Sequence, residues 1–155
     1  MRPLFTLLLA MLGLAALAWV WARRAWGPRA ALYAGLGILT SIGPFLFTRF
    51  IIPEAILSLL LLSALYAFFL SLEDQRTVYI YWTYAALALA TLTKGLIGPV
   101  FFAGTALPYL VITGHWRRWR SLNLASGLLL YLAIAAPWFI LATLEIGRAS
   151  CRERV

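Results

Sequence analysis

Few residues in this sequence could do chemistry, and three of them lie in short polar stretches between long apolar ones. Arg49 and Glu54 lie five residues apart in "TRFIIPEAILS", and Lys94 lies in "TLTKGL". A carboxylate can activate a hydroxyl, bind sugar hydroxyls or hold a metal, whereas arginine and lysine suit a phosphate. If the fold brings the three together, they predict a polar pocket for a phosphate-bearing ligand.

A purely structural explanation of the same charges stays open. Arg49 and Glu54 can simply pair with each other, and Lys94 can extend its ammonium group to lipid headgroups. Pro53 suits the first turn of a helix, where its missing N–H is no loss. Glu54 would then lie where the helix dipole favours a negative charge. Composition alone does not decide between a pair and a pocket.

The composition of the chain predicts that lipid surrounds it. Of the 155 residues, 64% are hydrophobic and 12% are charged, about half the charged fraction of a typical soluble domain. Within lipid every backbone polar group must be satisfied internally, so the spanning elements should be helices. The predicted fold class is therefore all-α, a polytopic bundle of membrane helices.

Six apolar runs predict about six transmembrane helices. Each run is roughly 15–23 residues long, near the length that crosses a bilayer. The stretches 30–72 and 78–113 are too long for one crossing each, so we divide the second at Lys94 and Gly95. The resulting runs are 3–21, 30–47, 55–72, 78–92, 96–113 and 122–144.

The basic residues predict the orientation. The net charge is +8, and the stretches 22–29 and 114–120 carry three arginines each. Alternating helices place both stretches, together with 73–76, on one side, which the positive-inside rule assigns to the cytoplasm. The N-terminus and the stretches at 48–54 and 93–95 then lie outside. Because the arginines cluster between apolar runs, we expect membrane lipids and no nucleic acid as partners.

Other reactive side chains add little. Cys151 is the only cysteine and His115 the only histidine, so neither a disulfide nor a metal site of these residues is expected. The glycines of "GLGILTSIG" do not follow a strand, which argues against a nucleotide-binding loop.

A series of short motifs runs along residues 3–144. It comprises an arginine-rich loop, an arginine followed five residues later by an acidic helix start, a "T-K-G" helix end, an aromatic and basic loop, and "P-W" in a later helix. The residues are Arg23, Arg24, Gly27, Arg29, Ala31, Arg49, Glu54, Thr93, Lys94, Gly95, "GHWRRWR" at 114–120, Pro137 and Trp138. In order and spacing they resemble bacterial glycosyltransferase family 39, which includes protein O-mannosyltransferases and aminoarabinose transferases.

The resemblance implies a GT-C fold and a glycosyltransferase. Such an enzyme passes a sugar from a polyprenyl-phosphate carrier to an acceptor at the outer face of the bacterial inner membrane. Glu54 matches the second acidic position of the family, where aspartate is commoner, and is the catalytic candidate. Lys94 matches a position that faces the carrier phosphate, and Arg49 is a supporting charge. The sugar, the acceptor and any divalent metal in the full-length enzyme stay open.

The sequence departs from the family pattern at both ends. It has no counterpart of the family's first transmembrane helix, nor of the outer loop that bears the main catalytic aspartate. We therefore expect residues 1–144 to form a partial GT-C fold, a fragment that is inactive alone. Residues 145–155, "EIGRASCRERV", place arginines on the outer side, so we expect a non-native or disordered tail.

A rival interpretation is a small non-catalytic membrane protein, such as half of a transporter or an assembly partner. Gly43-Pro44 and Gly98-Pro99 could be the helix breaks that transporters place near mid-membrane. The apolar runs around them hold no ionisable residue at mid-depth, however, and the charges lie at the outer edge. This placement favours chemistry at an interface.

Overall fold

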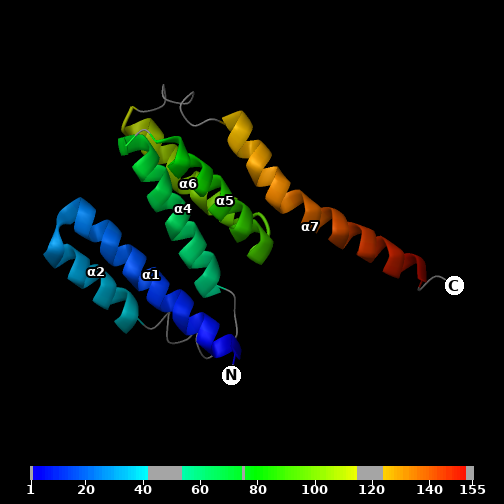
Figure 1. Ribbon diagram of the computed structural model, residues 1–155, viewed down its shortest axis with the longest axis horizontal. Helices are drawn as coiled ribbons and strands as arrows, with labels where there is room; N and C mark the ends of the chain where they lie inside the picture. Colours follow the sequence, from blue (N-terminus) through cyan, green and yellow to red (C-terminus); the bar gives the residue numbers. More distant parts are fainter. Residues whose placement is uncertain (1, 42–53, 75, 115–123, 153–155) are drawn as a thin grey trace.

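The computed structural model describes residues 2–41, 54–74, 76–114 and 124–152 of the chain. Within these ranges the fold is all-α, as predicted, with helices and connecting turns and no strand. Figure 1 shows the helices in chain order: α1 (Arg2–Trp26), α2 (Pro28–Thr40), α4 (Glu54–Asp74), α5 (Thr77–Lys94), α6 (Ile97–Ile112) and α7 (Leu124–Arg152).

The predicted division of residues 78–113 is confirmed. Helix α5 ends at Lys94, Gly95 follows with φ 74°, and α6 begins at Ile97. A positive φ of this kind is disfavoured for residues with a Cβ, so glycine suits the place where one helix stops and the next begins. Helix α4 ends at Asp74 and α5 begins at Thr77, so the break between them falls at the polar stretch 73–76.

The polar stretch 22–29 is more helical than predicted. Only Gly27, with φ 92°, interrupts the two helices, and Arg23 and Arg24 form part of the last turn of α1. Arginine is a good helix former, and its long side chain reaches water while its backbone stays in the helix. Pro28 begins α2, where its fixed φ is already helical.

Three described helical segments are long and apolar enough to cross a membrane: Phe5–Trp26, Glu54–Asp74 and Ala125–Thr143. The apolar segment Ile97–Ile112 is shorter. The described residues contain six helices, in line with the six apolar runs of the sequence, whereas the number of membrane crossings stays a prediction. Helix α7 continues to Arg152, past the boundary predicted at residue 144, and the origin of residues 145–155 also stays a prediction.

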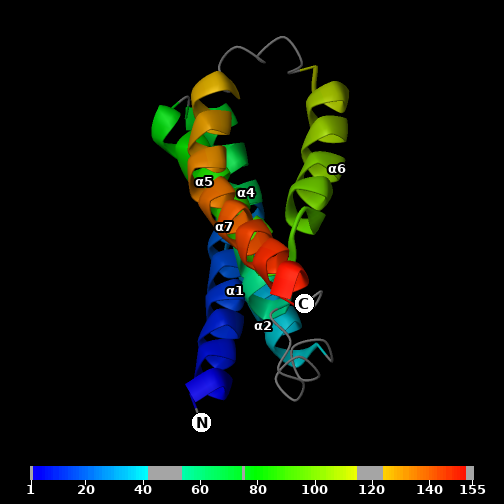
Figure 2. The same ribbon diagram turned by 90° about the vertical axis from the view of Figure 1, so that its right-hand side faces the viewer.

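Helix α4 lies at the centre of the bundle. It contacts α1 on one side and α5 and α6 on the other, while α2 packs on α1 and α7 packs on α5. Figure 2 shows α7 running across α5, with α6 standing to one side. Between α1 and α4, the ring of Trp21 lies 5.8 Å from that of Tyr66 and 5.3 Å from that of Phe69, measured between centroids.

Small side chains fill the contacts between helices. Ala55, Ala64, Ala88 and Ala90 are at most 1% exposed, whereas many large apolar side chains face outward. Membrane helices commonly pack in this way, because small residues allow close approach and lipid accepts the large apolar ones. The bundle thus has the outward-facing apolar surface that the composition predicted.

Candidate functional site

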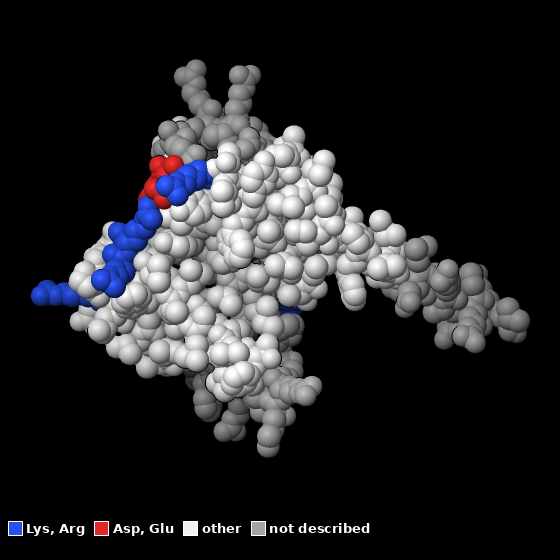
Figure 3. Space-filling model, viewed as in Figure 1, with Lys and Arg blue, Asp and Glu red and all other residues white. Residues whose placement is uncertain are grey.

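The charged side chains that the structure describes gather at opposite ends of the bundle. At one end, Nη2 of Arg24 in α1 lies 3.2 Å from carboxylate oxygens of both Glu73 and Asp74 in α4. We call these three residues the arginine end. On the face drawn in Figure 3, most charged residues follow one edge, over the α1–α2 and α4–α5 turns.

The opposite end brings together two of the three residues predicted from sequence. Nζ of Lys94 forms an ion pair and hydrogen bond with Oε1 of Glu54, 40 residues away along the chain. We call this pair the lysine end. Its side chains are 36% and 33% exposed, respectively, so a ligand can reach both. Arg49, the third candidate, lies outside the described residues.

Helix geometry explains why these two residues meet. Glu54 is the first residue of α4 and Lys94 the last of α5, and the two helices run side by side in opposite directions. Each charge also suits its helix terminus, because the dipole favours an anion at the start and a cation at the end. The pairing explanation named Arg49 as the partner of Glu54, and the described structure shows Lys94 in contact with that carboxylate.

The turn that carries Lys94 is well tied to its surroundings. The Gly95 N–H donates to the Thr91 carbonyl oxygen at 2.8 Å, which closes the last turn of α5. Thr93 Oγ1 donates to the Ala90 carbonyl oxygen at 2.7 Å. Gly98 at the start of α6 packs so closely on α5 that an added Cβ would lie 3.0 Å from the Cβ of Ala90. These contacts fix the backbone of Lys94, from which its side chain reaches the Glu54 carboxylate.

Residues 3–141 match the family model described as dolichyl-phosphate-mannose-protein mannosyltransferase. The chain belongs to this family. The resemblance seen in the sequence is thereby confirmed, and the mannosyltransferase family consists of membrane glycosyltransferases of the GT-C type. Among curated proteins and solved structures, no match was found.

For a member of the mannosyltransferase family, the lysine end offers two useful groups. The ammonium of Lys94 can hold a phosphate, and the carboxylate of Glu54 can accept a proton or orient a hydroxyl. In the structure the two opposite charges form an ion pair. Among the described residues, no three His, Cys, Asp or Glu side chains are grouped closely enough to hold a metal ion.

One contact near the lysine end escaped the sequence analysis. The hydroxyl groups of Thr91 in α5 and Tyr131 in α7 lie 2.9 Å apart, and Thr91 is 2% exposed. Thr91 precedes Lys94 by less than one helical turn. No spacing rule links two hydroxyls 40 residues apart on different helices, so the pair becomes visible only in the tertiary structure.

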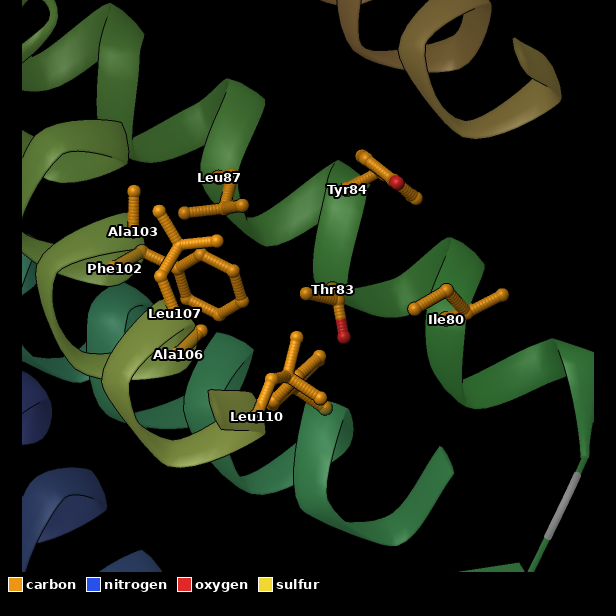
Figure 4. A pocket seen from close by; sticks show the side chains of 10 residues that line it. Ile80, Thr83, Tyr84, Leu87, Phe102, Ala103, Ala106, Leu107 and Leu110 are labelled. Carbon is orange, nitrogen blue, oxygen red and sulfur yellow. The ribbon is translucent and has the colours of Figure 1, made fainter. Parts of the chain in front are cut away.

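An apolar cavity of about 160 Å³ lies between α4, α5 and α6, away from the lysine end. Figure 4 shows side chains of α5 and α6 facing each other across it. The only polar side chains in its lining are those of Thr83 and Tyr84 in the first half of α5. Such a lining can accommodate an aliphatic group and offers nothing for catalysis. It consists of Phe68, Ile80, Thr83, Tyr84, Leu87, Phe102, Ala103, Ala106, Leu107 and Leu110.

Proposed function

We propose that this chain carries donor-binding elements of a glycosyltransferase that uses a polyprenyl-phosphate-linked sugar. The observation that supports this most is the lysine end, where Lys94 and Glu54 meet at the edge of an apolar bundle. Family membership supplies the reaction type, which favours an enzyme over half of a transporter or an assembly partner. The lysine end supplies the kinds of groups that the reaction needs.

In the proposed reaction, an acceptor hydroxyl attacks the anomeric carbon of the sugar. The new C–O bond forms as the bond from that carbon to the carrier phosphate oxygen breaks, and the phosphate leaves with the bonding electrons. Glu54 takes the proton of the hydroxyl, and Lys94 stabilises the negative charge on the leaving phosphate. Arg49 is the proposed supporting cation.

The ion pair between Lys94 and Glu54 then represents the state without substrate. Both side chains are about one-third exposed, and an ion pair of this kind contributes only about 0–1 kcal/mol. A carrier phosphate can therefore displace the carboxylate from Lys94 at little cost. Displacement leaves Glu54 unpaired beside the sugar, where it can act on the acceptor.

The same proposal places the lysine end at the outer face of a bacterial inner membrane, with the N-terminus outside. The argument is the excess of basic residues toward the opposite end, where Arg23 and Arg24 lie in the last turn of α1. A reporter that is active only outside the cytoplasm should be active when it is fused after Gly95. An inactive fusion of normal abundance would contradict this orientation.

Binding of the donor tests the site directly. The probes are polyprenyl-phosphate mannose and the uncharged polyprenol, titrated into the full chain in lipid nanodiscs. We expect the phosphate-bearing probe to bind more tightly than polyprenol. Lys94→Gln should weaken its binding about tenfold or more, because a charge-assisted hydrogen bond is lost. Glu54→Gln should leave binding equal or tighter, because the competing carboxylate is gone.

The arginine end provides the matched control. Arg24→Gln also removes one cation from an ion pair, and it should leave binding of polyprenyl-phosphate mannose unchanged. Equal affinities for polyprenol and the phosphate-bearing probe would overturn the proposal. So would equal losses in the Lys94→Gln and Arg24→Gln variants, because the effect would then come from net charge.

A further inference from the structure

Helix α7 is tied to α5 by side-chain hydroxyl groups at two levels. Tyr81 and Ser126 approach to 3.1 Å near the start of α5, and Thr91 and Tyr131 approach to 2.9 Å near its end. Both contacts join the same two helices through a tyrosine hydroxyl. They differ in what lies next to them along α5, because only the second adjoins the turn that carries Lys94.

The direction of the second hydrogen bond follows from the number of available protons. The Thr91 hydroxyl donates its one proton to the Leu87 carbonyl oxygen at 2.9 Å. It must therefore accept from Tyr131, whose hydroxyl is the donor across the helix interface. The result is a continuous chain of hydrogen bonds from α7 through Thr91 into the backbone of α5.

Thr91 also holds the turn that ends the helix. Its carbonyl oxygen accepts the Gly95 N–H at 2.8 Å. Lys94 lies within the turn that this bond closes and is the last residue of α5. Thr91 is 2% exposed, so water does not readily replace a lost partner. The side chain of Thr91 is thus fixed by α7, and its main chain fixes the turn of Lys94.

We propose that Tyr131 is a positioning residue for Lys94. Its hydrogen bond to Thr91 fixes the last turn of α5 and so places the ammonium group beside the Glu54 carboxylate. Among the described hydrogen bonds and ion pairs, none joins Tyr131 to Lys94 or Glu54, so Tyr131 acts through Thr91 and Gly95. The meaning of this placement for a phosphate ligand rests on the function proposed above, whereas the placement itself can be measured without any ligand.

The test compares two single-hydroxyl deletions by NMR of the full chain in nanodiscs. The variants are Tyr131→Phe and Tyr81→Phe, and the signals are the exchange rate of the Gly95 amide and the ¹³C shift of the Glu54 carboxylate. We expect exchange of Gly95 to rise about threefold in Tyr131→Phe, the usual effect of losing one hydrogen bond between membrane helices. The carboxylate signal should move toward its position in Lys94→Gln.

Tyr81→Phe should change neither signal, although it removes a hydroxyl from the same helix interface. Variants of Thr91 provide the second comparison: Thr91→Val should behave as Tyr131→Phe, and Thr91→Ser should keep the wild-type signals because it retains the hydroxyl. If Tyr131→Phe leaves both signals unchanged, or if Tyr81→Phe shifts them equally, the positioning role is wrong.

Titration with polyprenyl-phosphate mannose separates this inference from the proposed function. If the wild-type chain binds the probe, Tyr131→Phe should weaken binding about threefold and Tyr81→Phe should not. Equal affinities in these two variants would count against the positioning role. If the wild-type chain does not bind the probe, the proposed function fails, and the Gly95 and Glu54 signals still decide whether Tyr131 positions Lys94.

Discussion

The two ends of the bundle both contain ion pairs, and they differ in what surrounds them. At the arginine end, Arg24 faces two carboxylates, and its side chain and that of Glu73 are 47% and 63% exposed. At the lysine end, one cation faces one carboxylate, and both are about one-third exposed. The first arrangement joins α1 to α4 and includes Asp74, which is 35% exposed. The second joins α4 to α5 beside a glycine turn and a hydroxyl pair in which Thr91 is buried.

This difference shows that an ion pair by itself does not identify a site. The arginine end joins α1 to α4 by exposed ion pairs, which add little stability. Basic residues beside apolar helices also have a general explanation as orientation signals. The backbone of the lysine end is held by contacts within α5 and from α6 and α7. It therefore has the more fixed geometry of the two.

Charge reversal should have the largest effect on this comparison. Lys94→Glu places two carboxylates together where a phosphate should bind, and we expect affinity for polyprenyl-phosphate mannose to fall about a hundredfold or more. Arg24→Glu makes the equivalent change at the arginine end and should leave affinity unchanged. Titration in nanodiscs gives both values, and similar losses in both variants would remove the distinction between the ends.

A methyl group added at Gly127 should cause the next largest effect. A Cβ there would lie far inside van der Waals contact of the Tyr84 ring, so Tyr84 must swing away and α7 must repack on α5. We expect Gly127→Ala to lower the free energy of unfolding by about 1–3 kcal/mol, measured by denaturant titration in detergent. Gly104→Ala is the control, because its Cβ would meet nothing within 4 Å. Equal effects would show that α7 does not pack as described.

A smaller effect is expected at Gly98, which lies beside the lysine end. Its added Cβ would lie 3.0 Å from the Cβ of Ala90, so α6 must move away from α5 by a few tenths of an ångström. We expect Gly98→Ala to cost about 1 kcal/mol of unfolding free energy and to speed Gly95 amide exchange. Gly104→Ala in the same helix should do neither. Unchanged exchange in Gly98→Ala would mean that α6 does not support the Lys94 turn.

The smallest effect is expected from neutralising the arginine end. Arg24→Gln removes an exposed ion pair and should cost about 0–1 kcal/mol of unfolding free energy, less at high salt. Glu73→Gln should cost less still, because Asp74 remains 3.2 Å from Arg24. The measurement is unfolding at low and high ionic strength. A loss of several kcal/mol that salt does not reduce would show that this end is a buried network.

Much of the fold could be predicted from sequence because lipid imposes strict demands. Long apolar runs must be helices, and the turns at 73–76 and at Gly95 lie where polar residues interrupt those runs. The exception at Arg23 and Arg24 has a simple cause. A charged side chain that can reach water does not need to end a helix, so the polar residues there did not mark the helix end.

The candidate site was predicted only in part. Alternation of helices was enough to expect Glu54 and Lys94 at the same end, because each lies next to a turn. It was not enough to name Lys94 as the partner of Glu54, and Arg49 stays a prediction. Tyr131 and Thr91 were missed because each looks like an ordinary polar residue within an apolar helix.

The sequence by itself determined that this chain is a bundle of apolar helices with its charges at the ends, and its motif order indicated the glycosyltransferase family. Only the tertiary structure decided which charges pair and which hydroxyls meet. The physical reason is that a helix in lipid is apolar on all sides, so no polar stripe shows which face packs against a neighbour. The rotation and crossing of α4, α5 and α7 bring Glu54, Lys94, Thr91 and Tyr131 into their contacts.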